Sequence, residues 1–213
     1  MIPSFQVYLF DVDGTLVDSA TDICGAIRDA LAGTPQANCE ETFLRGYIGR
    51  HLVDLFSDLF PAYSPAQLDE LILTYRKFYP ARGHKSTKLY PGVVEGLAAL
   101  PGRKSTATTK GTPMTRSVLE LFGLLPFFDH VQGTDGFPHK PAPDVILKSL
   151  EVFGATPDQA LMIGDSTADI VAGKRAGVRT CAVSYGYGQP EQLAALEPDY
   201  WIADLRELVP AAC

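Results

Sequence analysis

The chain has 213 residues, of which 46% are hydrophobic and 20% are charged, and its formal net charge is −7 at pH 7. These proportions are typical of a globular protein with one domain, or with one domain and a modest insertion. They argue against a broad basic surface for nucleic acid or anionic membrane, and no apolar stretch approaches the roughly 20 residues that span a bilayer. We therefore expect neither a nucleic acid nor a membrane as partner. The N-terminus lacks a basic segment followed by a long apolar run, which predicts a protein that is not exported.

The cysteines are expected to be free thiols. Cys24, Cys39, Cys181 and Cys213 are scattered along the chain without CxxC spacing. They form neither a zinc signature nor a compact disulfide framework. Free thiols are typical of a reducing compartment, so the sequence predicts a cytoplasmic protein.

Short apolar or β-favouring runs predict the strands of a sheet. They cover residues 6–10, 105–109, 131–134, 160–164 and 180–184. Helical patterns lie between them, including one over 114–123 and one from about 169 to 177. This alternation predicts an α/β fold with a parallel sheet.

The stretch from residue 18 to 88 lacks convincing strands and predicts an inserted all-helical domain. Its amphipathic patterns predict helices over 19–31, 40–47, 51–60 and 65–79, the last preceded by Ser64 as N-cap. Residues 83–92 are rich in small and turn-forming residues and are expected to form the return linker. The predicted organisation is a core of residues 1–17 and 89–213 with a helical domain over 18–88.

The first candidate motif is the acidic pair of Asp11 and Asp13, which follows directly on the first predicted strand. Ligand sites in open α/β sheets lie at such carboxyl ends. Two neighbouring acids are tolerated where a divalent cation lies between them or where one is protonated. Both conditions suit phosphoryl transfer, in which one aspartate attacks phosphorus and a second acid moves the protons. For the pair in isolation, an acidic surface turn is the alternative.

A second acidic cluster, GDSTAD, follows the predicted strand at 160–164. Its carboxylates Asp165 and Asp169 are four residues apart, a spacing that predicts stacking on one helical face. Oxygen ligands from the ends of two strands are what Mg²⁺ prefers. Alone, the cluster could be an N-cap with an exposed acid, but beside the first motif it predicts a metal site.

Phosphate also needs hydrogen-bond donors and a cation. The sequence offers Thr108 at the end of a β-like run and Lys140 within HKPAP. The flanking prolines are expected to hold Lys140 in a stiff, extended loop. A lysine among carboxylates can stabilise the transferring group and relieve repulsion between the acids. A lone lysine is more often a surface charge, and the position of Lys140 after the third predicted strand favours a role in the site.

Together these elements resemble a known family. DVDGTLVDS, Thr108, Lys140 within KPAPD, and GDSTAD resemble the four ordered motifs of the haloacid dehalogenase superfamily, over nearly the whole chain. The resemblance implies a Rossmann-like parallel-sheet core with a helical cap that closes over the active site. It also implies a Mg²⁺-dependent phosphatase that acts on a small phosphorylated metabolite through an aspartyl-phosphate.

The resemblance also implies roles for the acids. Asp11 would be the nucleophile and a magnesium ligand, and Asp13 the general acid and base, with its backbone carbonyl on the metal. Asp165 would complete the protein ligands. Ser166 and Asp169 would support the metal site, and Asp169 could instead orient the lysine.

The remaining implied roles concern the substrate. Thr108 would donate hydrogen bonds to the phosphoryl oxygens, and Lys140 would neutralise the charge of phosphate and nucleophile. The layout is most similar to the phosphoglycolate phosphatase type, which commonly reads Thr-Asn-Lys at the second motif. This chain has Thr108-Thr109-Lys110. Thr109 therefore replaces an amide among the expected substrate contacts.

The expected substrate contacts of the cap lie in residues 47–52. Arg50 is the candidate for binding a substrate carboxylate or second anion, and Gly49 would let the backbone approach closely. The alternative for Arg50 is an exposed side chain beside a helix start. For His51, capping or surface packing is favoured over substrate contact. Cap closure is expected to hinge near Asp18 and residues 85–92.

Alternative functions are a sugar-phosphate mutase similar to β-phosphoglucomutase, a pyrophosphatase, or a non-catalytic binding protein. The intact acids and lysine argue against the last. The motifs are common to phosphatase and mutase, and neither the physiological substrate, the oligomeric state nor the extent of cap motion has a signature in the sequence.

Overall fold

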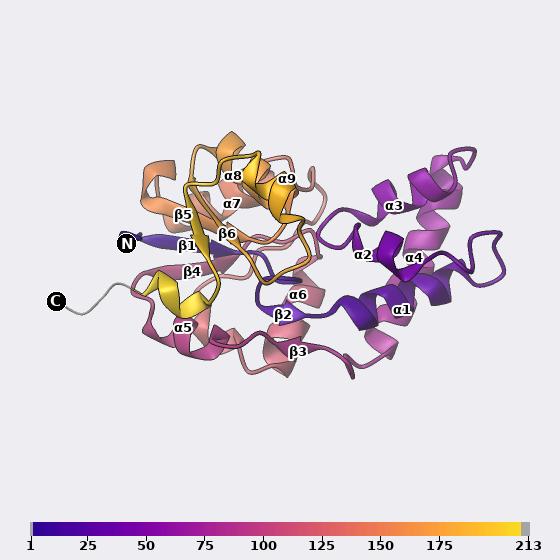
Figure 1. Cartoon of the computed structure of the whole chain (residues 1–213), viewed down its shortest axis with the longest axis horizontal. Coiled ribbons are helices and arrows are strands. Elements are labelled where there is room, and N and C mark those ends of the chain that lie inside the picture. Colours follow the sequence, from indigo (N-terminus) through magenta and orange to yellow (C-terminus); the bar gives the residue numbers. More distant parts are fainter. Residues whose placement is uncertain (1, 210–213) are drawn as a thin grey trace.

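A computed structural model describes residues 2–209, and a parallel sheet forms its centre (Figure 1). The five strands of this sheet lie in the order β4-β1-β5-β6-β7, and every neighbouring pair is parallel. They are β1 (Val7–Phe10), β4 (Arg103–Thr106), β5 (Ala160–Gly164), β6 (Arg179–Val183) and β7 (Tyr200–Ile202). The predicted α/β class with a parallel sheet is confirmed.

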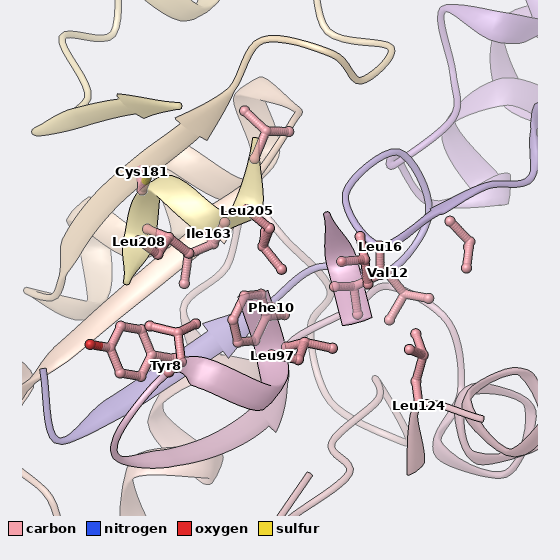
Figure 2. Close-up of a cluster of buried hydrophobic side chains, with 14 of the residues drawn as sticks. Tyr8, Phe10, Val12, Leu16, Leu97, Leu124, Ile163, Cys181, Leu205 and Leu208 are labelled. Carbon is pink, nitrogen blue, oxygen red and sulfur yellow. The ribbon is translucent and has the colours of Figure 1, made fainter. Parts of the chain in front are cut away.

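Helices cover both faces of this sheet. They are α5 (Val93–Ala99), α6 (Thr112–Leu121), α7 (Asp144–Phe153), α8 (Thr167–Ala176) and α9 (Pro190–Ala194), with short 3-10 turns at Leu125–Phe127, Pro157–Gln159 and Leu205–Leu208. Side chains of β1 alternate between the faces, as the pleat requires. Tyr8 and Phe10 pack with α5, α6 and Leu205–Leu208 (Figure 2), whereas Val7 and Leu9 pack with α7 and α8. All four β1 residues are buried, which explains the continuous apolar run in the sequence.

The prediction of a strand over 131–134 is wrong. This segment makes only an isolated bridge between Ser105 and His130. Beyond it, the Thr106 hydroxyl donates a hydrogen bond to the backbone carbonyl of Gln132 at 2.9 Å and accepts one from the backbone N–H of Gln132 at 2.8 Å. A side chain therefore takes the place of the ladder that a strand would form. Conversely, β7 was not predicted, because three residues are too few for a periodic pattern to show.

The helices α6 and α8 both begin two residues earlier than predicted. Pro113 lies in the first turn of α6, where its missing N–H costs nothing. Ser166 is the N-cap of α8, and its backbone N–H donates to the Asp169 carboxylate at 2.9 Å. This capping box sets the start of α8. Gly177, with φ of 77°, ends it as predicted.

The four helices predicted between residues 18 and 88 are present. They are α1 (Ala20–Leu31), α2 (Glu41–Arg45), α3 (Leu52–Leu59) and α4 (Pro65–Ala81). The backbone of Ser64 donates to the Gln67 side chain at 2.9 Å, so the predicted N-cap of α4 is part of a capping box. These helices share a hydrophobic cluster of their own, which includes Leu31, Leu44 and Phe56. In Figure 1 they lie at the opposite end of the long axis from the sheet.

A short antiparallel pair joins the two regions. It consists of β2 (Val17–Asp18) and β3 (Lys88–Leu89), so the predicted return linker over 83–92 contains a strand. Asp22 of α1 holds this segment, since its carboxylate accepts hydrogen bonds from the Ser86 N–H at 3.0 Å and the Thr87 hydroxyl at 2.8 Å. The division into domains over 18–88 and the rest stays a prediction, and its boundaries coincide with this strand pair.

Two further expectations, on membrane-spanning helices and on the cysteines, can be compared with the described residues. Within 2–209 no helix is both long and apolar enough to cross a bilayer. Cys24, Cys39 and Cys181 are free thiols, as predicted, and Cys213 lies outside the described residues.

Candidate active site

Asp11 lies at the end of β1 and is 1% exposed. Its N–H donates to the Ile163 carbonyl at 2.9 Å, which continues the sheet pairing by one residue and fixes the start of the turn. The carboxylate Oδ1 accepts a hydrogen bond from Lys140 Nζ at 2.7 Å, and the buried Oδ2 has no hydrogen-bond partner. Burial raises the pKa of Asp11 to about 7, although Lys140 opposes the rise. One oxygen of this carboxylate is therefore buried and uncompensated.

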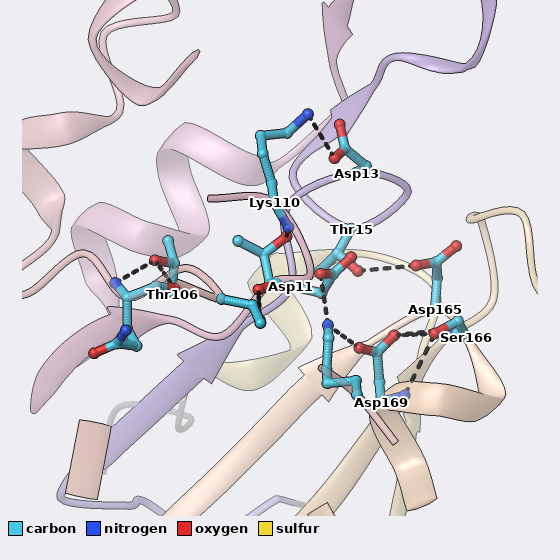
Figure 3. Close-up of polar contacts among 12 residues, drawn as sticks. Asp11, Asp13, Thr15, Thr106, Lys110, Asp165, Ser166 and Asp169 are labelled. Atoms are coloured by element: carbon cyan, nitrogen blue, oxygen red, sulfur yellow. Dashed lines mark hydrogen bonds and ion pairs between the residues drawn. The ribbon is translucent and has the colours of Figure 1, made fainter. Parts of the chain in front are cut away.

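Lys140 lies buried between two carboxylates. Its ammonium group contacts both Asp11 and Asp169 (Figure 3). Burial alone would lower the pKa of Lys140, but the two ion pairs outweigh burial and raise it. The other oxygen of Asp169 accepts hydrogen bonds from the Ser166 N–H at 2.9 Å and hydroxyl at 2.7 Å. Both oxygens of Asp169 are thus engaged in holding Lys140 and the N-cap of α8.

Asp165 lies just before α8. The prediction that Asp165 stacks with Asp169 on one helical face is therefore wrong, because the chain turns at the Ser166 N-cap between them. The Asp165 carboxylate accepts hydrogen bonds from the Tyr187 N–H at 2.7 Å and the Thr15 hydroxyl at 3.4 Å. Burial, together with the charges of Asp169 and Asp11, raises the pKa of Asp165 well above its usual value.

A divalent cation fits the chemistry of this cluster. Asp11, Asp165 and Asp169 each offer an oxygen within 4.8 Å of the others, and all three are buried. Three carboxylates face one lysine, so added positive charge would relieve their repulsion. Gly14, with φ of 92°, leaves room for the Asp165 carboxylate, which a Cβ at this position would overlap. The unpartnered Oδ2 of Asp11 is the kind of hard oxygen ligand that Mg²⁺ prefers.

Asp13 faces away from this cluster, toward the helices α1–α4. Its carboxylate accepts a hydrogen bond from the Ser19 hydroxyl at 2.6 Å and lies 3.1 Å from Lys110 Nζ. Lys110 also donates to the Tyr79 hydroxyl of α4 at 3.1 Å. Burial opposes the charge of Lys110, but Asp13 outweighs it and raises the pKa of the lysine. No role is predicted for Lys110 from the sequence, and only its place in the second motif could have indicated one.

Thr108 is buried two residues beyond the end of β4, not at the strand end as predicted. Its hydroxyl accepts a hydrogen bond from the Lys110 N–H at 3.3 Å, and its carbonyl accepts one from the Thr134 hydroxyl at 2.9 Å. These contacts fix the turn that places Lys110 next to Asp13. Thr109 lines a cavity between this turn and the helical region.

The segment 47–51 of the helical region reaches the core at Ser166. Gly49 has φ of 87°, and a Cβ there would lie 3.2 Å from that of Ser166, which is the close approach that the glycine permits. His51 stacks on His139 of the core with ring centroids 4.1 Å apart, and its Nδ1 accepts a hydrogen bond from the Val53 N–H at 3.2 Å. The prediction that His51 has a capping role is therefore confirmed. Burial, with a smaller effect of His139, lowers the pKa of His51 to about 4.

Arg50 lies at the edge of the same cavity. Its guanidinium lies 4.5 Å from the centre of the Tyr47 ring, and Nε is 3.9 Å from the Asp54 carboxylate. The side chain is 45% exposed. Arg50 lines the cavity together with Asp13, and its binding of a substrate anion stays a prediction.

Tyr187 connects the acids with the start of α1. Its N–H donates to Asp165, and its hydroxyl donates to Asp18 at 2.9 Å. The same hydroxyl accepts the N–H groups of Ser19 at 2.7 Å and Ala20 at 3.0 Å. One residue of the core therefore contacts both a candidate metal ligand and the chain where it enters the helical region.

Residues 8–183 match the family model described as haloacid dehalogenase-like hydrolase. The chain belongs to this family. The match includes residues 8–10 of β1, the helical region and the two acidic motifs, and Tyr187 lies beyond its end.

Named relatives agree over the full length. The chain is 34% identical to a phosphoglycolate phosphatase of Aquifex aeolicus, with 96% of this chain and 95% of the relative covered. It is 30% identical to the pyrophosphatase PpaX of Oceanobacillus iheyensis, with 97% and 96% covered. A solved haloacid dehalogenase-like hydrolase of Streptococcus pneumoniae superposes with a TM-score of 0.86 at 27% identity, covering 96% of each chain.

Proposed function

We propose that this protein is a cytoplasmic Mg²⁺-dependent phosphatase that hydrolyses a small organic phosphomonoester through an aspartyl-phosphate on Asp11. The observation that supports this best is the buried Asp11 carboxylate, with one oxygen on Lys140 and the other without a partner. An acidic surface turn, the alternative for the isolated motif, would be exposed and would have no buried lysine.

In the first step, an oxygen of Asp11 attacks phosphorus, and the bond between phosphorus and the ester oxygen breaks. Asp13 donates a proton to the departing alcohol. Thr108 and Lys140 would bind the phosphoryl oxygens, and Lys140 would offset their charge. Asp169, with Ser166, holds Lys140 in position for this role.

In the second step, Asp13 takes a proton from water, whose oxygen attacks the phosphorus of the aspartyl-phosphate. Inorganic phosphate leaves, and Asp11 is regenerated. Both oxygens of Asp13 are engaged by Ser19 and Lys110, which holds this carboxylate apart from the nucleophile.

Asp11 and Asp165, with the backbone carbonyl of Asp13, are the proposed ligands of Mg²⁺. When bound, the ion would supply positive charge that stabilises the transferring phosphoryl group. Because Asp169 forms an ion pair with Lys140 and accepts the N–H of the N-cap residue Ser166, we assign Asp169 to positioning Lys140 and not to the metal.

The names of the relatives point to two substrates. The relatives named phosphoglycolate phosphatase make 2-phosphoglycolate the first candidate substrate. The relative named pyrophosphatase PpaX makes inorganic pyrophosphate the second. A mutase would use the same aspartyl-phosphate but would pass the phosphoryl group to a sugar hydroxyl in place of water.

The test is phosphate release from 2-phosphoglycolate, sugar phosphates and pyrophosphate, with Mg²⁺ or with a chelator. We expect metal-dependent release of phosphate from an ester without any bisphosphate activator. Isomerisation of a sugar phosphate that needs a bisphosphate and releases no inorganic phosphate would favour the mutase, and preference for pyrophosphate would favour the second candidate. No release from any compound, or equal release with chelator, would contradict the proposal.

A further inference from the structure

A cavity of about 590 Å³ lies between the helical region and the turn that follows β4. Asp13 is among the residues that line it, whereas Asp11, Thr108, Lys140 and Asp165 are not. In Figure 3 the pair of Asp13 and Lys110 likewise lies apart from the chain of contacts through Asp11 and Asp169. The cavity therefore opens onto the residue proposed to protonate the leaving alcohol. If the proposed function holds, this cavity is where the alcohol part of the substrate lies.

Apart from Arg76 of α4, the wall that the helices contribute consists of apolar and aromatic side chains. Ile23 and Ile27 of α1, Leu55 of α3 and Tyr75 of α4 line the cavity, and Met114 of α6 lines it from the core. The first four are buried members of the hydrophobic cluster of the helical region, and Met114 packs against that cluster. A polar or charged group placed against such a wall loses hydration without gaining a partner. The wall therefore suits an apolar ligand.

The cations of the cavity offer little to a buried carboxylate. Lys110 is already paired with Asp13 at 3.1 Å. Arg50 is 45% exposed and lies beside Asp54, and Arg76 is exposed on α4. Among the described lining residues, none is a buried cation without an acidic partner. The chemistry of the wall thus differs from that expected of a site for a two-carbon acid.

The volume leads to the same conclusion. Pockets of roughly 300–1,000 Å³ typically enclose ligands of drug size. A two-carbon leaving group would leave most of this space to water against isoleucine, leucine and methionine. We infer that the substrate is a phosphomonoester whose alcohol carries an apolar group the size of a ring, held between α1, α3, α4 and α6 with the ester oxygen at Asp13.

The test compares esters of alcohols with similar acidity, so that the chemical step is alike. The probes are ethyl phosphate, 2-phosphoglycolate and 2-phenylethyl phosphate, each with Mg²⁺. We expect kcat/KM for 2-phenylethyl phosphate to exceed both others by about tenfold or more. An equal or lower value would overturn the inference and leave the proposed phosphatase standing.

A substitution in the cavity wall tests where the apolar group of the substrate lies. Met114→Gln keeps the size of a half-buried side chain and adds an amide to the cavity. We expect the ratio of kcat/KM for 2-phenylethyl over ethyl phosphate to fall roughly fivefold. Leu121→Gln, on the same helix but 57% exposed and outside the cavity, is the matched control and should leave the ratio unchanged. An unchanged ratio in Met114→Gln would contradict the placement of the apolar group.

A binding measurement keeps this inference separate from the proposed function. Titration calorimetry of the Asp11→Asn variant compares 2-phenylethyl phosphate with ethyl phosphate in the absence of turnover. If no ester is hydrolysed by the unmodified protein, the proposed phosphatase is wrong, and the affinity decides on the cavity. Tighter binding of 2-phenylethyl phosphate supports an apolar site, and equal binding overturns it.

Discussion

The cluster around Asp11 and the cavity beside Asp13 are built in different ways. Asp11 and Asp165 follow adjacent parallel strands, whose register places them together, and Lys140 reaches both Asp11 and Asp169. The cavity is lined by three helices of the inserted region and by α6 and turns of the core, with no regular pairing between them. A sheet edge therefore fixes the position of the chemistry, whereas the packing of helices sets the shape of the space for the substrate. The position of the reacting groups and the shape of the substrate space can therefore vary independently. Variants that change only one of these two features test whether they are separate.

The largest effect is expected from Asp11→Asn. The change removes the nucleophilic charge and preserves the shape of the side chain, so kcat should fall by about 10⁴-fold or more. The measurement is phosphate release by purified variant, with circular dichroism and thermal unfolding to verify the fold. Asp199→Asn, which alters a carboxylate that binds Thr180 far from the cluster, is the control and should retain turnover. Substantial activity in Asp11→Asn would contradict the covalent role.

A smaller loss is expected from Asp13→Asn. The amide can neither protonate the alcohol nor activate water, so both steps should slow, and kcat should fall by about 10² to 10⁴-fold. Rapid-quench kinetics would measure formation and decay of the phosphorylated enzyme separately. If the variant changed only the dependence on Mg²⁺ concentration, the acid and base role of Asp13 would be wrong.

The smallest effect concerns the contact between helical region and core at His51. The folded state lowers the pKa of His51 from 6.5 to about 4, so protonation disfavours the packed arrangement. Stability from the neutral ring is complete above pH 6.5 and is lost as pH falls toward 4. The groups around it are His139, Asp54 and Arg76. Because the ring is partly exposed, solvent screening limits the change in unfolding free energy to below about 2 kcal/mol.

Thermal unfolding at pH 7.5 and pH 5 would measure this dependence. His51→Asn retains a good N-cap for α3 without a titrating ring, so it should lose less stability between the two pH values than the unmodified protein. An identical loss in both proteins would show that His51 does not contribute.

The sequence indicated the Asp11 region far better than the cavity. The acids and the N-cap serine lie in short motifs, each next to a strand or helix end, so local patterns locate them. Lys140 was indicated by the KPAPD motif alone, because the strand predicted before it is absent. The ion pair of Lys110 with Asp13 depends on a turn after β4 and on Tyr79 of α4, and no local pattern encodes it. The prediction for 131–134 failed for a related reason, because the Thr106 side chain occupies the hydrogen-bonding groups that a strand would need. Apolar residues of the helices were predictable as core, but not as the wall of a cavity.

Tyr187 gives the two regions a thermodynamic connection. Its backbone binds Asp165, and its hydroxyl binds the chain from Asp18 to Ala20. The predicted movement of the helical region about β2 and β3 would change these hydroxyl contacts, and a change in the charge around Asp165 would alter the backbone contact. Ion binding at the acids and movement of the helical region would therefore both involve Tyr187, and their coupling would be reciprocal. To the extent that an ion at the acids favours one position of the helices, that position strengthens binding of the ion by the same factor.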